Sequence, residues 1–100
     1  MPAPPDRLED ERHDLERLRR EIESIDRDLI HLIARRVRLA RKVGIVKHAT
    51  GLPAIDPIRE ADVLRRASEV ARGEGAPEAD VRYLFQYLID MSRRAQHIDD

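Results

Sequence analysis

The sequence predicts an all-α protein in which one very long helix precedes two shorter ones, assembled as a homodimer. Apolar residues recur at alternating spacings of three and four from Leu15 to Val46, the pattern of one face of a long helix. Only 3% of the residues are aromatic, whereas sheet proteins favour aromatic and β-branched residues. Start and stop signals for two further helices follow between Asp56 and Gln96.

The N-terminal residues 1–11 are rich in proline and charge and contain no apolar core. We expect them to form a disordered tail. The remaining chain has no shift in composition, which favours a single helical domain over residues 12–98.

The first helix is expected from about Arg12 to His48, with Thr50, Gly51 and Pro53 ending it. Its apolar face holds nine apolar residues and one arginine: Leu15, Leu18, Ile22, Ile25, Leu29, Leu32, Arg36, Leu39, Val43 and Val46. A helix of roughly 50 Å outruns any core that two shorter helices could build beside it. We therefore expect a homodimer with antiparallel long helices; the alternative is a monomeric three-helix bundle with a frayed N-terminus.

The second helix is predicted to begin with Asp56 as N-cap and Pro57 at the first helical position, and to stop at Gly73 and Gly75. Pro77, Glu78 and Asp80 open the third helix. Its expected inner face consists of Val81, Leu84, Phe85, Leu88, Ser92, Ala95 and Gln96.

Composition excludes several classes of function. No cysteine is present, which excludes disulfides, thiolate metal sites and cysteine nucleophiles. A net charge of −1, from 19 basic and 20 acidic residues, argues against non-specific nucleic-acid binding. No apolar run reaches the roughly 20 residues of a membrane span, and the N-terminus is no secretory signal, so we expect a cytoplasmic protein. The four histidines show no metal-ligand spacing, and we expect neither metal nor cofactor.

Arg36 is the exception on the apolar face. A guanidinium stays protonated, and burying it without a partner costs several kcal/mol or more. Either a protein carboxylate or an anionic ligand must compensate it. Lys47 lies 11 residues further along, on the same side and about 16 Å away, so the two long side chains could grip a small dianion. A solvated lysine near the helix end is the simpler interpretation of Lys47.

Arg19 lies 28 residues before Lys47, roughly 42 Å along one helix. The two side chains of one chain therefore cannot reach the same small molecule. If Arg19 contributes to that site, it must come from the partner subunit; otherwise it is an ordinary charge flanking a coiled-coil interface.

Polar residues on the two shorter helices complete the candidate set. Ser92 and Gln96 form an i,i+4 pair on an otherwise apolar face, which suggests a polar lining or the satisfaction of backbone groups. Asp56 has a sufficient role as a cap. Arg59, near Glu60 in the first turn, is harder to explain, because a cation there opposes the helix dipole.

Taken in order, these residues closely resemble the all-helical class of chorismate mutases. The matching stretches are Leu18-Arg19, the I-x-x-I-D run from Ile22 to Asp26, Ala34-Arg35-Arg36, Val43-Gly44-x-x-Lys47, Asp56-x-x-Arg59-Glu60, Phe85-Gln86 and Ser92-x-x-x-Gln96. The resemblance covers about Leu15 to Gln96. It implies an intertwined dimer, two shared sites, and the rearrangement of chorismate to prephenate in aromatic amino acid biosynthesis.

The resemblance also implies roles for the candidate residues. Arg36 and Lys47 would hold the carboxylates, with Lys47 and Gln96 donating to the ether oxygen. Asp56 and Glu60 would meet the ring hydroxyl, Arg59 and Ser92 would support a carboxylate or order the site, and Arg19 would come from the partner.

Three alternatives remain open. A mutase for 4-amino-4-deoxychorismate is not separated by the sequence, and an isochorismate pyruvate-lyase of the same fold is disfavoured by the intact Asp56-x-x-Arg59-Glu60. A non-catalytic helical dimerisation module would explain the heptads, but not the recurrence of Lys47, Arg59, Ser92 and Gln96.

Overall fold

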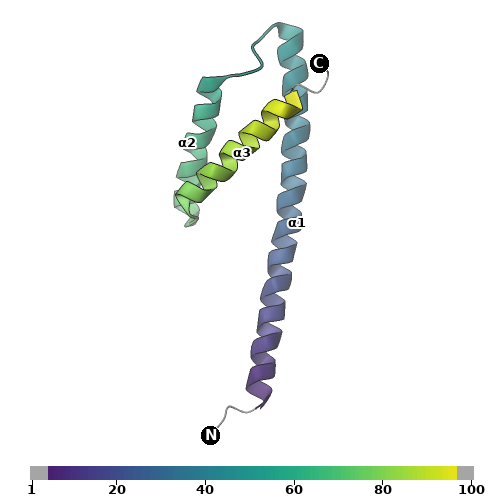
Figure 1. Cartoon of the computed structure of the whole chain (residues 1–100), viewed down its shortest axis with the longest axis vertical. Coiled ribbons are helices and arrows are strands. Elements are labelled where there is room, and N and C mark those ends of the chain that lie inside the picture. The colour runs from purple at the N-terminus through teal and green to yellow at the C-terminus, as the bar shows by residue number, and fades with distance from the viewer. Residues whose placement is uncertain (1–4, 97–100) are drawn as a thin grey trace. The chain divides into compact units, whose positions relative to one another are not determined.

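Three helices make up the part of the chain that the structure, a computed structural model, describes, namely residues 5–96. They are α1 (Pro5–Thr50), α2 (Pro57–Glu74) and α3 (Glu78–Gln96), and residues 5–96 contain no strand (Figure 1). The predicted all-α fold with one very long helix is confirmed. None of these helices has the combination of length and apolar character that crossing a bilayer requires.

The N-terminal boundary differs from the expected one. Residues 5–11, which we predicted as part of a disordered tail, are the first turns of α1. Proline suits the first turn because it has no N–H to leave unpaired, and the acidic Asp6 complements the helix dipole there. The helix therefore begins ten residues before Leu15, where the apolar pattern used for the prediction starts. Residues 1–4 of the predicted tail lie outside the described residues.

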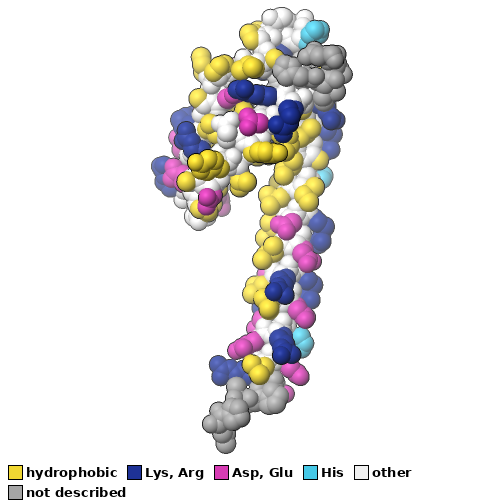
Figure 2. Space-filling view, in the orientation of Figure 1, with side chains coloured by type: hydrophobic (Ala, Val, Ile, Leu, Met, Phe, Trp, Pro, Cys, Tyr) yellow, Lys and Arg dark blue, Asp and Glu magenta, His cyan; other side chains and the backbone are white. Residues whose placement is uncertain are grey.

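The chain divides into two units, residues 1–34 and 35–100. Within the first unit, the described residues are all part of α1. Hydrophobic side chains form a stripe along one side of this stretch, with charged side chains beside it (Figure 2). The stripe residues from Leu15 to Leu32 are between 47% and 57% exposed within the single chain.

The second unit contains the last turns of α1 together with α2 and α3. Helix α2 has the predicted caps: the Asp56 side chain accepts a hydrogen bond from a backbone N–H, and Gly75 ends the helix with a φ of 70°. Gly73, expected to help stop α2, is instead inside it. A short turn then leads into α3 (Figure 1).

Small side chains dominate the core of this unit. Its buried apolar residues are Ala40, Ala67, Ala71, Ile89 and Ala95. The expected inner face of α3 agrees with the structure except at two positions: Ile89, which it omitted, is buried, and Leu84, which it included, is 64% exposed. Short side chains let helix backbones approach closely, which brings polar residues of α1, α2 and α3 around one pocket.

Candidate active site

A pocket of about 420 Å³ lies within the second unit, a volume typical of small-molecule sites. Seven of the eight predicted site residues line it: Arg36, Lys47, Asp56, Arg59, Glu60, Ser92 and Gln96. The eighth, Arg19, belongs to the first unit and is not among the lining residues.

Arg36 lies half-buried in the pocket wall and is bonded only to neutral oxygens. Its guanidinium donates to the carbonyl of Leu88 at 3.0 Å and to the hydroxyl of Ser92. Burial, and secondly the positive charge of Arg59, lower the pKa of Arg36 below its ordinary value. Within residues 5–96 no carboxylate forms an ion pair with this arginine, so its positive charge remains available to a ligand.

Lys47 is the second pocket cation for which residues 5–96 supply no carboxylate partner. Its Nζ donates to the carbonyl of Ala54 at 3.0 Å and to Oε1 of Gln96 at 3.3 Å. Two neutral acceptors hold the ammonium in position without cancelling its charge. Because the Gln96 oxygen accepts from Lys47, the amide nitrogen of that side chain remains a donor for a ligand.

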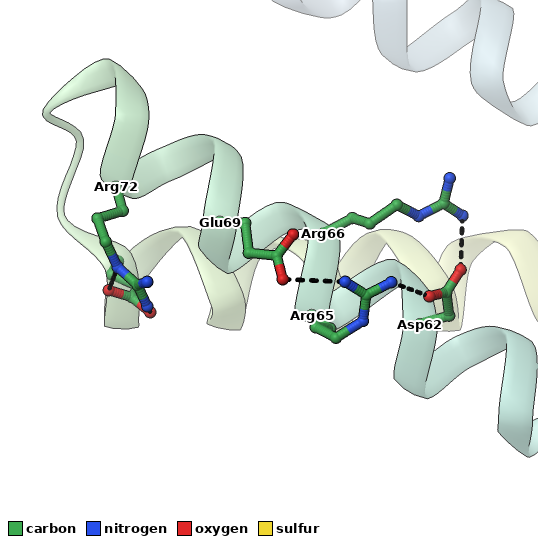
Figure 3. Close-up of polar contacts among 6 residues, drawn as sticks. Asp62, Arg65, Arg66, Glu69 and Arg72 are labelled. Atoms are coloured by element: carbon green, nitrogen blue, oxygen red, sulfur yellow. Dashed lines mark hydrogen bonds and ion pairs between the residues drawn. The ribbon is translucent and has the colours of Figure 1, made fainter.

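The first turn of α2 supplies Asp56 and Arg59. Asp56 is the N-cap, its Oδ1 accepting the backbone N–H of Arg59 at 3.0 Å. The exposed Arg59 side chain lies 3.6 Å from Asp62, which also pairs with Arg65 and Arg66 along α2 (Figure 3). The hydrogen bond from Arg65 is the main reason that the pKa of Asp62 is lowered. This exposed network contributes little to stability, but it gives Arg59 a nearby counter-charge.

Glu60 has a partner that the sequence did not reveal. Arg93 of α3 binds it through two hydrogen bonds, from Nε to Oε2 at 2.8 Å and from a terminal nitrogen to Oε1. Arg93 lies four residues after the buried Ile89, on the face of α3 that our inner-face prediction omitted. That i,i+4 relation was the one signal that could have identified it.

Gly44 is the other residue whose role the sequence did not reveal. A Cβ built on it would lie 2.8 Å from Cα and 3.0 Å from the carbonyl oxygen of Gln96. Real Cβ atoms do not approach backbone atoms that closely, so only glycine allows the end of α3 to pack here. The close approach holds Gln96 beside Lys47.

The pocket is cationic. Four basic side chains, Arg36, Lys47, Arg59 and Arg93, and two acidic ones, Asp56 and Glu60, line it, which leaves two positive charges in excess. Among residues 5–96, Arg36 and Lys47 are the two pocket cations whose side chains donate only to neutral acceptors. Such a site favours a small molecule that carries two negative charges.

Comparison with known proteins assigns the family. Residues 18–97 match the sequence model of the family described as chorismate mutase type II. The chain belongs to this family. The resemblance inferred from the sequence motifs is thereby confirmed.

The relatives that match this chain differ in the share of their own length that the match covers. A chorismate mutase of Methanocaldococcus jannaschii is 32% identical over 82 residues, covering 82% of this chain and 83% of the relative. A 4-amino-4-deoxychorismate mutase of Streptomyces venezuelae is 28% identical over 88 residues, covering 88% and 85%. A T-protein of Haemophilus influenzae is 51% identical over 51 residues, covering 51% of this chain but only 14% of the T-protein.

A solved structure supports the fold. A conserved hypothetical protein from Pyrococcus furiosus superposes with a TM-score of 0.70 at 32% sequence identity, covering 84% of this chain and 96% of that one.

Proposed function

We propose that this protein is a chorismate mutase that rearranges chorismate to prephenate. The observation that carries the proposal is the pair of pocket cations, Arg36 and Lys47, which donate to neutral oxygens. Chorismate carries two carboxylates, so the excess charge of the pocket matches the charge of this substrate. The family and the relative of similar length from Methanocaldococcus jannaschii support the same activity.

The chemistry requires charge and shape rather than a nucleophile. The rearrangement is pericyclic, so no proton transfer and no covalent intermediate is needed. By holding both carboxylates, Arg36 and Lys47 would select the compact diaxial conformer in which the reacting carbons meet. Ser92 would keep the Arg36 guanidinium in place, since its hydroxyl accepts one of the guanidinium hydrogen bonds.

Electrostatic stabilisation of the breaking bond would supply most of the remaining acceleration. Negative charge grows on the ether oxygen as the C–O bond lengthens. Donors fixed beside that oxygen, from Lys47 and the amide nitrogen of Gln96, stabilise the transition state more than the ground state. Asp56 and Glu60 would accept from the ring hydroxyl, with Arg59 at the rim supporting a carboxylate.

The assembly we propose is an intertwined homodimer in which each pocket receives Arg19 from the partner. The apolar face of α1 supports a second copy, because its residues remain about half exposed in the single chain. The expected cytoplasmic location and the absence of nucleic-acid partners stay predictions.

The purified protein should convert chorismate to prephenate. The loss of the ultraviolet absorbance of chorismate measures this reaction. Release of pyruvate from isochorismate instead would identify a lyase, and preferential turnover of 4-amino-4-deoxychorismate would identify the amino-substrate mutase. No turnover of any of the three by a folded dimer would favour a non-catalytic dimerisation module and contradict the proposal.

The shared site predicts complementation between two inactive variants. Arg19→Ala and Arg36→Ala each damage both sites of their own homodimer. A heterodimer of the two rebuilds one whole site, so a mixture after subunit exchange should recover about a quarter of the wild-type activity for a two-fold symmetric dimer. Native mass spectrometry would verify the exchange, and heterodimers without activity would show that Arg19 does not cross the interface.

A further inference from the structure

The acidic end of the pocket is the part whose chemistry the proposed function leaves undetermined. Asp56 and Glu60 lie one helical turn apart at the start of α2, and both line the pocket. A ring substituent that donates hydrogen bonds would face this end. The substituent is a neutral hydroxyl in chorismate, but an ammonium in 4-amino-4-deoxychorismate, because alkyl amines are protonated near pH 7.

Glu60 does not present a free negative charge to that substituent. Both of its carboxylate oxygens accept hydrogen bonds from the Arg93 guanidinium. The side chains are 21% and 40% exposed, so the pair is partly shielded from water. Its hydrogen bond to Glu60 raises the pKa of Arg93, as expected for a cation held by a carboxylate.

The geometry therefore combines acceptors with a fixed positive charge. A carboxylate oxygen that accepts one hydrogen bond from Arg93 retains a lone pair for a hydroxyl. An ammonium at the same place would meet the Arg93 guanidinium as a like charge, and the paired Glu60 carboxylate would no longer offer it a full counter-charge for the hydration it loses on binding.

We propose that Arg93 is a specificity-determining residue, which through its pairing with Glu60 makes the pocket accept a neutral hydroxyl and reject a cationic ammonium on the substrate ring. The inference rests on the proposed function and narrows it to hydroxyl-bearing substrates. It depends on Arg93, a residue of α3 that lies outside the sequence motifs matched to the family.

The test compares kcat/KM for chorismate and for 4-amino-4-deoxychorismate in three variants. Arg93→Met keeps the length of the side chain but removes the charge, and it should raise the ratio of amino to hydroxyl substrate by roughly tenfold or more. Arg93→Lys keeps the charge and should leave the ratio within about threefold of wild type. Arg94→Met is the matched control, because Arg94 is exposed and lies over the Tyr87 ring rather than in the pocket.

The outcomes separate the two proposals. An unchanged ratio in Arg93→Met, in a variant that still turns over chorismate, overturns the role of Arg93 and leaves the mutase function intact. A wild-type protein that turns over neither substrate overturns both. If Arg93→Met does not fold, Arg93→Gln replaces it, and the inhibition constant of the amino compound against chorismate turnover gives a second measure of the same preference.

Discussion

Replacing Arg36 with alanine should lower kcat/KM for chorismate by about 10³-fold or more while the protein stays helical. Loss of one preorganised donor costs about 10² to 10³ in rate, and here a carboxylate-binding charge disappears with it. Arg36→Lys keeps the charge but loses the planar guanidinium with its paired N–H donors, so it should recover only part of the activity.

Stability should respond differently from activity in Arg36→Ala. The Leu88 carbonyl that loses the guanidinium still accepts the Ser92 hydroxyl at 2.9 Å, so no buried acceptor is left unpaired. The substitution also removes the repulsion between Arg36 and Arg59. We therefore expect the thermal midpoint, followed by circular dichroism, to change little.

Arg41→Ala is the control for Arg36→Ala, since Arg41 is an exposed arginine on the same helix and does not line the pocket. It should retain full activity. A fall in the Arg36→Ala midpoint by roughly 10 °C or more, with activity lost only in proportion to unfolding, would assign Arg36 a structural role instead.

Replacing Gly44 with alanine should reduce kcat by about 10²-fold, although residue 44 offers no functional group. The added methyl would meet the Cα, carbonyl oxygen and Cβ of Gln96 at 2.8, 3.0 and 3.1 Å. Rotation of the Gln96 side chain does not move any of these three atoms, so the backbone at the end of α3 must shift. A displacement of about 1 Å at a catalytic donor can cost 10²-fold in rate, and the Gln96 contact to Lys47, now 3.3 Å, would lengthen.

The expected stability change for Gly44→Ala is small. Alanine gains up to about 1 kcal/mol over glycine inside a helix, and overpacking costs about 1–3 kcal/mol. Gly73→Ala provides the matched control, because Gly73 is also inside a helix but an added Cβ would meet nothing within 4 Å. This variant should be slightly more stable and fully active. Equal activity of the two alanine variants would show that the close approach at Gly44 is not needed for catalysis.

Much of the fold follows from local sequence signals. The ends of α2 agree with the structure because a cap depends on a few adjacent residues: Asp56 and Pro57 start the helix and Gly75 stops it. The start of α1 did not follow, since Leu8 is the one large apolar residue of its first turns and a period cannot be recognised from a single residue. The inner face of α3 was misassigned at Leu84 and Ile89, because an apolar residue next to the true face looks the same in sequence as one on it.

By itself, the sequence determined that the chain is helical, that a guanidinium interrupts the apolar face of its longest helix, and which family it resembles. These properties depend on residue type and spacing along one helix. Only the tertiary structure decided that Arg36 and Lys47 donate to neutral oxygens, that Arg93 pairs with Glu60, and that Gly44 contacts Gln96. Most of these contacts join residues more than 30 positions apart in the sequence, and one joins Lys47 to the carbonyl of Ala54 in the loop before α2. They therefore depend on how the helices and this loop pack together, which spacing along one helix does not determine.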